Sequence, residues 1–396
     1  MSAPERAPAV SLPLAQPSIT EPPAEYARLQ AECPVARVVT ENGTHAWMVT
    51  RYEDVRFVLA DPRFSIRFAG AASDNAEDAP EESLFQDPPG HSRLRRLVGR
   101  AFTARRMADL RPAVRRTAER LAAEMADDYP PAELVSDFAF PLSINVISEL
   151  LGVPTPDRAD FRAWSEAVIS LTAHTPEEIG AAWNNLQGYV AELIEAKRRD
   201  PGSDLMSALI AVRDNEDDKL STGELRTMAV TLLVAGHVST VNAITMGMLT
   251  LLTNRAQYDR LVADPGLIEG AVEEILRCQF GKRGLMRIAK DDVQVGEALI
   301  RKGDTVFAEL GAANVDASLF PEPARFDITR PENPHLAFGH GIHHCLGAAL
   351  GRMELHVTLE VLSSAFPLMR TVLPVERIPL RTGLLDQSPA ALLVTW

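Results

Sequence analysis

The densest group of chemically reactive side chains lies at residues 338–347, where Cys345 follows a glycine-rich stretch. The sequence predicts a helix that starts near Cys345 and runs to about Phe366. A helix N-terminus stabilises a thiolate through its dipole and its free N–H groups. The preceding glycines would let backbone N–H groups approach the sulfur. This arrangement suits an anionic sulfur ligand to a metal.

Three other interpretations of Cys345 compete with this one. Structural zinc would have four histidines nearby, but zinc prefers paired ligands such as closely spaced cysteines, which the sequence lacks. A catalytic thiol would need a histidine and an orienting acid, and no such pattern is evident. A structural buried cysteine would leave the glycine spacing unexplained. The four histidines are His335, His340, His343 and His344.

The run Phe338-Gly339-His340-Gly341-Ile342-His343-His344-Cys345-Leu346-Gly347 resembles the haem-binding loop of the cytochromes P450. Three further segments occur in the family's order. Glu274–Arg277 is similar to its Glu-x-x-Arg pair, and residues 320–326 are similar to the segment whose arginine, here Arg325, contacts that pair. Residues 87–96 are similar to the helix that covers the haem propionates. The resemblance extends from about residue 25 to the C-terminus.

The resemblance implies haem b as the cofactor and a role for each matching residue. Cys345 would be the axial thiolate ligand of the iron, and Phe338 would pack beside its sulfur. Gly339 and Gly347 would complete the loop. Glu274, Arg277 and Arg325 would form a structural ion-pair network. The residues expected to bind the two propionates are His91, Arg95, Arg287 and His343.

Residues 235–240 depart from the family's distal-helix motif, Ala-Gly-x-acid-Thr. In the family, the acid and the alcohol pass protons to oxygen. Here Val238 takes the place of the acid and cannot carry a proton, whereas Ser239 takes the place of the alcohol and can still hydrogen-bond oxygen or water. Gly236 would let the helix open where oxygen binds. The residues expected to act in catalysis are Gly236, His237, Ser239 and Thr240.

The same stretch is similar to the cyclodipeptide-oxidising group of the family, which includes mycocyclosin synthase. Residues 284–289 and 294–303 show further local similarity to that group. The resemblance implies oxidative C–C or C–N coupling of a tryptophan-containing cyclic dipeptide, to a second copy or to another aromatic such as a nucleobase, in secondary metabolism. The alternative is a monooxygenase that hydroxylates a polyketide, terpenoid or macrolide, because a substrate hydroxyl can stand in for the missing acid. A haem-binding sensor or carrier without turnover is a third interpretation.

The family's topology places the expected substrate contacts on several separate segments. His237 and Gln86 are the candidate partners of an amide or indole group. For each single residue, core packing is an equally good interpretation. The expected pocket is mainly apolar and comprises Phe64, Ser65, Gln86, Val168, Thr172, Val234, Val238, Phe280, Leu285, Met286, Leu384 and Leu385.

No flavin or iron–sulfur segment is fused to the P450-like region, which ends at Trp396. We therefore expect electrons from a separate ferredoxin and its reductase, with O2 as the oxidant. A basic island between residues 93 and 106 would attract an acidic ferredoxin. Its members are Arg93, Arg95, Arg96, Arg100, Arg105 and Arg106.

Composition narrows the class of protein further. The 396 residues carry a net charge of −14, which disfavours a general binder of nucleic acid or anionic membrane. Three cysteines are too few for a disulfide framework. The sequence lacks an apolar run typical of a signal peptide or a membrane span. We expect a cytoplasmic monomer.

The elements that must position these residues are mainly helical. Proline-rich residues 1–24 are interpreted as an irregular arm. The resemblance implies that residues 25–396 form one cytochrome P450 prism, mainly α with small β-sheets. Ser221 and Glu224 predict a capping box ahead of a helix at about 222–252. Short β-type runs around Glu41-Asn42-Gly43 predict a hairpin, and residues 69–90 predict a long mobile loop.

Overall fold

The computed structural model describes residues 10–41, 43–66, 83–99, 102, 104–128, 130–154, 158–170, 173–215, 220–281, 284–381, 383 and 387–396. Most of the loop predicted at 69–90 lies outside these residues, as do Asn42 and three expected pocket residues, Thr172, Leu384 and Leu385.

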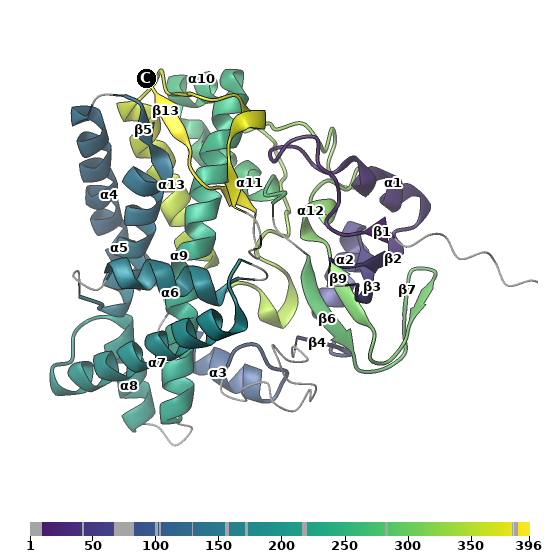
Figure 1. Ribbon diagram of the computed structural model, residues 1–396, viewed down its shortest axis with the longest axis horizontal. Helices are drawn as coiled ribbons and strands as arrows, with labels where there is room; N and C mark the ends of the chain where they lie inside the picture. Colours follow the sequence, from purple (N-terminus) through teal and green to yellow (C-terminus); the bar gives the residue numbers. More distant parts are fainter. Residues whose placement is uncertain are drawn as a thin grey trace, which may run out of the picture.

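Helices make up most of the molecule (Figure 1). They are α1 (Ala24–Glu32), α2 (Tyr52–Ala60), α3 (Gly90–Gly99), α4 (Ala104–Asp127), α5 (Phe140–Leu151, after a π-helical turn at Val135–Ala139), α6 (Arg158–Val168), α7 (Pro176–Arg199), α8 (Leu205–Asn215), α9 (Thr222–Thr253), α10 (Arg255–Ala263), α11 (Ile268–Arg277, after a 3₁₀ turn at Pro265–Leu267), α12 (Leu310–Ala313) and α13 (Ala348–Ala365). The prediction of a mainly helical fold is therefore confirmed.

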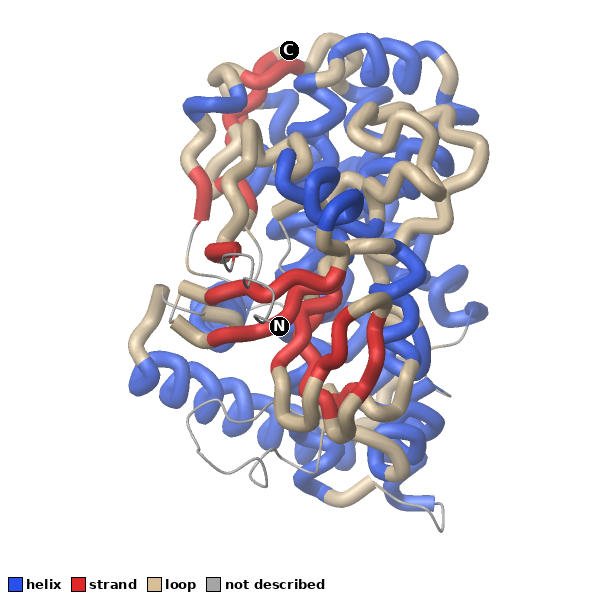
Figure 2. Tube along the Cα trace, turned by 90° about the vertical axis from the view of Figure 1, so that its right-hand side faces the viewer, coloured by secondary structure: helices blue, strands red, loops and turns tan. Residues whose placement is uncertain are grey.

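The largest sheet has six strands in the order β1-β2-β3-β9-β6-β4. It lies to one side of most of the helices in Figure 1 and faces the viewer in Figure 2. Its strands are β1 (Val10–Ser11), β2 (Val35–Val39), β3 (His45–Val49), β4 (Phe64–Ser65), β6 (Leu285–Ala289) and β9 (Thr305–Ala308). Three small sheets use β5 (Ala132–Glu133), β7 (Val293–Val295), β8 (Ala298–Ile300), β10 (Arg370–Thr371), β11 (Leu380–Arg381), β12 (Ser388–Pro389) and β13 (Leu393–Thr395).

Over its described residues, the predicted N-terminal arm is irregular apart from the two-residue strand β1. β1 pairs in parallel with β2, with Val10 opposite Val38, so the arm is anchored at the edge of the large sheet. The predicted hairpin is confirmed, because β2 and β3 are antiparallel neighbours. Gly43 has φ +80°, a conformation that favours glycine at the turn.

α9 begins at the predicted capping box and is the central helix of the fold. The Ser221 hydroxyl accepts a hydrogen bond from the Glu224 amide, and the Glu224 carboxylate accepts one from the Ser221 amide. By length and composition α9 could cross a membrane, but 78% of its most apolar window is buried in the fold. It packs against α5, α7, α11 and α13, as expected of a core helix.

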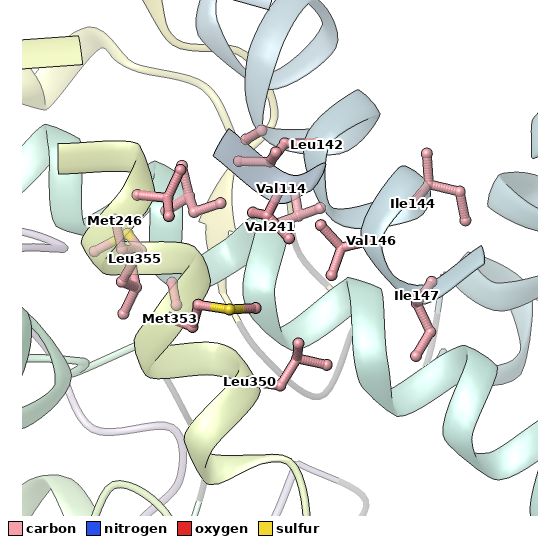
Figure 3. Close-up of a cluster of buried hydrophobic side chains, with 14 of the residues drawn as sticks. Val114, Leu142, Ile144, Val146, Ile147, Val241, Met246, Leu350, Met353 and Leu355 are labelled. Atoms are coloured by element: carbon pink, nitrogen blue, oxygen red, sulfur yellow. The ribbon is translucent and has the colours of Figure 1, made fainter. Parts of the chain in front are cut away.

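Side chains from four helices meet in the core on one side of α9 (Figure 3). Val114 comes from α4, Leu142 and Ile147 from α5, Val241 from α9 and Leu350 from α13. Four of these five side chains are nearly inaccessible to solvent, and Val241 is 6% exposed. This packing fixes α13, and with it the Cys345 loop that precedes α13, relative to α9.

Candidate functional site

The Cys345 loop has a fixed backbone that depends on two glycines. Gly339 has φ +72° and Gly341 has φ +74°, both unfavourable for residues with a side chain. A Cβ at Gly341 would also lie 3.0 Å from the Leu59 carbonyl oxygen on α2. The Cys345 amide donates to the Phe338 carbonyl at 2.9 Å and closes the loop, and Cys345 itself is exposed.

The position of the final helix corrects one expectation. Cys345 does not begin α13, which starts at Ala348 with Gly347 as its N-cap residue. A 3₁₀ turn at Gly341–His343 comes first, and it ends at His344, whose backbone (φ −50°, ψ 136°) is not helical. A Cβ at Gly347 would lie 4.0 Å from Cys345 Sγ, so the sulfur still lies beside the N-terminal end of α13.

A group of basic side chains converges beside this loop from three elements. The rings of His91 on α3 and His343 in the loop are 4.1 Å apart. Arg287 on β6 is 3% exposed, and Arg95 donates to the His344 carbonyl at 2.7 Å. Burial lowers the pKa of His343 to about 4, and the positive charges of His91 and Arg287 act in the same direction. Burial also lowers the pKa of Arg287 to about 10.

These residues fit a ligand that carries carboxylates. Among the described residues, Asp87 is the carboxylate that interacts with His91, Arg287 and His343, and it also pairs with Lys290 at 3.4 Å. The buried Nδ1 of His91 has no hydrogen-bond partner among the described residues. Carboxylates placed here would supply that partner and favour the charged forms of the basic groups. The two propionates of haem meet this requirement.

The structure does not support the zinc alternative. Nowhere in the described part of the chain do three His, Cys, Asp or Glu side chains come together as metal ligands. Cys345 would therefore be the single protein ligand to a metal that is otherwise held by a non-protein group, as in a haem-thiolate site.

Behind Phe338 lies a charged network that sequence analysis missed. The Arg352 guanidinium on α13 stacks 4.6 Å from the centre of the Phe338 ring. Glu273 on α11 accepts hydrogen bonds from Arg352 at 2.7 and 2.9 Å and pairs with His335 Nε2 at 3.0 Å. Although burial opposes it, these partners lower the pKa of Glu273 to about 2. No motif signalled the network, because its members are far apart in sequence.

The buried Glu274–Arg277 pair forms as predicted, but its third member is different. Arg277 donates to both Glu274 oxygens at 2.7 and 2.8 Å, and neither side chain is exposed. The second arginine on Glu274 is Arg330, at 3.1 Å, and not Arg325. The Arg325 side chain is 53% exposed and pairs with Glu322 and Asp327 instead. Only its backbone carbonyl joins the network, where it accepts from Arg277 and Arg330.

α9 has one exposed patch in its otherwise buried central turns. Ala235 and Ser239, one turn apart, are exposed, whereas Val234, Val238 and Thr240 are buried. Ser239 Oγ donates to the Ala235 carbonyl at 2.8 Å, and Thr240 Oγ1 donates to the Gly236 carbonyl at 3.2 Å. The open face of the helix therefore presents a methyl group and a hydroxyl but no acid.

Two expected catalytic residues face elsewhere. A Cβ on Gly236 would lie 2.5 Å from Ile147 Cδ1, so this glycine allows α5 to pack closely on α9. The His237 ring is 2% exposed and meets Phe140 of α5 edge-on, with Nδ1 2.9 Å from the Leu233 carbonyl. Two residues rotate a helix by roughly 200°, which places His237 opposite Ser239. It is therefore poorly placed to contact a substrate at that face.

The described pocket candidates differ in their surroundings. Leu285 and Met286 on β6 are accessible, and Leu285 Cδ1 lies 3.5 Å from where a Cβ of Gly339 would be. Phe64 is buried and meets the exposed Phe57 ring edge-on, and Ser65 pairs with Ile288 in the sheet. Gln86 is buried and donates to the Ser83 carbonyl, and Val168 is half-buried at the end of α6. Phe280 is buried and lines a cavity under residues 12–23 of the N-terminal arm.

The basic island is smaller at the surface than predicted. Arg93 forms an ion pair with Glu224 at the start of α9, and Arg95 hydrogen-bonds the His344 carbonyl in the Cys345 loop. Arg96 and Arg105 are exposed, with the Arg105 side chain 92% accessible. Arg100 lies outside the described residues.

Known proteins match both the fold and the site. The family model described as Cytochrome P450 matches residues 161–374, more than half of the chain. Nocardicin C N-oxygenase from Nocardia uniformis subsp. tsuyamanensis is 44% identical over 98% of each chain. Mycinamicin IV hydroxylase/epoxidase from Micromonospora griseorubida is 44% identical over 94% of each chain.

Solved structures agree. The LnmA cytochrome P450 hydroxylase from the leinamycin biosynthetic pathway of Streptomyces atroolivaceus superposes with a TM-score of 0.89 at 40% identity, covering 98% of this chain and all of that one. Sequence identity along nearly the whole chain and a shared fold lead to one conclusion: this chain belongs to the cytochrome P450 family, whose members use haem b.

Proposed function

We propose that this cytochrome P450 monooxygenase hydroxylates or epoxidises a hydroxyl-bearing secondary metabolite of the polyketide or macrolide class, with electrons from a ferredoxin. The observation that carries the substrate class is the open face of α9. It offers the Ser239 hydroxyl without an acid, because Val238 is buried and apolar.

Residues of this chain would hold the cofactor at three places. Cys345 would supply the axial thiolate, and Phe338 would pack beside it. His91, Arg95, Arg287 and His343 would bind the propionates, which explains the orphaned Nδ1 of His91. Bound haem with a thiolate ligand supplies the activation of O2 for insertion into C–H or C=C bonds.

Proton delivery would then depend on Ser239 and on the substrate. Ser239 Oγ already donates to the Ala235 carbonyl, so it can accept a hydrogen bond from a water or a substrate hydroxyl. A substrate hydroxyl beside Ser239 would order the water that Val238 cannot hold. Thr240 points its hydroxyl to Gly236 and supports the helix backbone.

The named relatives favour oxygen insertion over coupling. Their names describe a hydroxylase/epoxidase of mycinamicin IV, an N-oxygenase of nocardicin C and a leinamycin-pathway hydroxylase. Coupling of a cyclic dipeptide rests on the local similarity around Ser239 alone and stays a prediction. It makes no use of an inserted oxygen atom, which gives the two reactions different products.

The ferredoxin would dock on the surface around α3 and the start of α4, where Arg96 and Arg105 are exposed. Positive charge at this point of an acidic chain would steer an acidic partner. Charge reversal at Arg105 should therefore slow reduction by ferredoxin and weaken its dependence on salt.

The experiment is turnover of the holoenzyme with ferredoxin, its reductase and ¹⁸O₂. The substrates are mycinamicin IV, nocardicin C and a cyclic dipeptide of two tryptophans. A product that gains one labelled oxygen from the macrolide supports the proposal. A product that loses two hydrogens from the cyclic dipeptide, with no label, would replace it with coupling. Rapid reduction without any product from a wider macrolide panel would contradict the substrate class.

A further inference from the structure

Two neighbouring glutamates near the end of α11 belong to different networks. Glu274 belongs to the buried ion-pair network. Glu273 pairs with His335 Nε2 at 3.0 Å and accepts hydrogen bonds from Arg352 at 2.7 and 2.9 Å. Glu273, His335 and Arg352 form the Glu273 network, which joins α11 to the segment before the Cys345 loop and to α13. The two helices also pack against each other.

The hydrogen bonds of the Glu273 network determine its charges. The Ala337 amide donates to His335 Nδ1 at 3.2 Å, so this nitrogen carries no proton and Nε2 donates to Glu273. His335 is therefore neutral. Both oxygens of Glu273 accept from the Arg352 guanidinium, which favours the ionised carboxylate. At neutral pH the network thus holds one negative charge on Glu273 and one positive charge on Arg352.

The same network contacts the ring of Phe338. The Arg352 guanidinium carbon lies 4.6 Å from the centre of this ring, and the centre of the His335 ring lies 6.2 Å from it. A Cβ at Gly351 would lie 3.8 Å from the ring, so the start of α13 contacts Phe338 directly as well. Because Glu273 binds both His335 and Arg352, it holds both of these neighbours of the Phe338 ring in place.

Phe338 connects the Glu273 network to Cys345. The Cys345 amide donates to the Phe338 carbonyl at 2.9 Å, so the backbone of one residue is bound to that of the other. Charges and hydrogen bonds around a ligand sulfur tune the metal that it binds. The Glu273 network is therefore placed to act on the thiolate through Phe338.

The two charges of the network act on haem reduction in opposite directions. Reduction by ferredoxin adds one electron to the thiolate-ligated haem, so a nearby positive charge favours the reduced state and a nearby negative charge opposes it. Arg352 Nε and Glu273 Oε1 are 2.7 Å apart, so the two charges offset each other. Removal of one would leave the charge of the other uncompensated behind Phe338.

We propose that Glu273 and Arg352 are positioning residues behind the axial thiolate, and that their paired charges set the reduction potential of the haem. The pair keeps the net charge on the far side of Phe338 at zero. It thereby determines how readily an electron from ferredoxin enters. The inference rests on Cys345 as the axial ligand, and the carbon monoxide spectrum tests that assignment separately.

The test is spectroelectrochemical titration of the substrate-free holoenzymes with dithionite and mediator dyes, which measures the midpoint potential without ferredoxin. Glu273→Gln leaves Arg352 unbalanced and should raise the potential, whereas Arg352→Gln leaves Glu273 unbalanced and should lower it. The two side chains are 26% and 39% exposed, so solvent screening reduces both effects. We expect each variant to change the ratio of ferrous to ferric haem by at least about threefold, or about 28 mV for a one-electron couple.

Three further variants separate charge from structure. The double variant of Glu273→Gln and Arg352→Gln removes both charges and should have a potential close to that of the wild type. Arg352→Lys keeps the positive charge and should lie closer to the wild type than Arg352→Gln does, which also tests the charge if Glu273→Gln does not retain haem. Glu269→Gln removes an exposed charge from the same helix and should change the ratio by less than about twofold.

Opposite shifts in Glu273→Gln and Arg352→Gln support the inference. Shifts in the same direction overturn it, because loss of structure alone would move both variants the same way. It is also overturned if Arg352→Lys is lowered as far as Arg352→Gln, or if neither single variant shifts more than Glu269→Gln. Unchanged potentials with a thiolate band in the carbon monoxide spectrum overturn this inference alone, whereas absence of that band from haem-loaded wild type overturns the assignment of Cys345 as well.

Discussion

Replacing Glu273 with glutamine removes the central charge of the network behind Phe338. The carboxylate interacts with Arg352 and His335, and these partners lower the pKa of Glu273 from 4.5 to about 2. A shift of this size corresponds to about 3 kcal/mol of folding stability at neutral pH. The Glu273 side chain is 26% exposed. Solvent screening therefore leaves about 2 kcal/mol as the expected loss in Glu273→Gln.

The stability lost in Glu273→Gln should depend on pH, in a direction set by the pKa of Glu273. The pKa of Glu273 is lower in the folded state than in the unfolded state. The stabilisation is therefore complete above pH 4.5 and disappears as the pH falls through about 2. Near pH 3 it should have dropped to about 1 kcal/mol or less. The wild type and Glu273→Gln should thus become more alike as the medium is acidified.

The assay is urea unfolding of both holoproteins at neutral pH and at successively lower pH, as far as both stay folded. Glu269→Gln is the matched control, because Glu269 is exposed on the same helix and should change stability by less than about 0.5 kcal/mol. The reasoning is refuted if Glu273→Gln loses no more stability than Glu269→Gln, or if its loss is the same at every pH.

Three further predictions concern the ion-pair network and α9. Arg330→Ala should lower the free energy of unfolding by about 1.5–3 kcal/mol, because it removes charged hydrogen bonds to the buried Glu274 carboxylate, which then keeps Arg277 as its arginine partner. Arg325→Ala should lower the free energy of unfolding by less than about 1 kcal/mol, because its side chain makes only exposed ion pairs among the described residues. Equal losses in urea unfolding would contradict the corrected network. Gly236→Ala should lower the free energy of unfolding by about 1–3 kcal/mol, because the new methyl group would collide with Ile147. In the double variant, Ile147→Ala should remove this collision, so the two losses should not add. Simple additivity of the two losses would argue against the packing explanation. Ser239→Ala should reduce product formed per NADPH by less than about tenfold, since a single hydrogen bond contributes about 1 kcal/mol. A loss beyond about a hundredfold would show that Ser239 alone delivers the protons, without help from the substrate hydroxyl and water.

Local signals in the sequence were enough to predict the start of α9 and the loop before Cys345. The capping box at Ser221 placed the start of α9 at the correct residue. The glycines before Cys345 predicted a loop whose backbone can approach the sulfur, and in the structure Gly339 and Gly341 have positive φ, which only glycine adopts easily. These features were readable because they depend on residues a few positions apart.

Long-range contacts could not be read in the same way. Arg325 and Arg330 both lie in or just after the segment that was expected to contact the Glu274–Arg277 pair. Only the path of the chain between them decides which of the two side chains reaches Glu274. His237 shares a motif with Ser239, but the helix turns it toward Phe140. The cavity that Phe280 lines is formed by the N-terminal arm, the end of β9 and residues near the C-terminus, and no sequence pattern connects these segments.

The most direct test of the haem-thiolate assignment is the Soret band of the reduced protein with carbon monoxide, compared between wild type, Cys345→Ser and Cys33→Ser. Thiolate ligation gives this complex a band at longer wavelength than ligation by histidine does. The account predicts the thiolate band in the wild type and in Cys33→Ser, and its loss in Cys345→Ser. A thiolate band that survives in folded Cys345→Ser, or that is absent from haem-loaded wild type, would contradict the account.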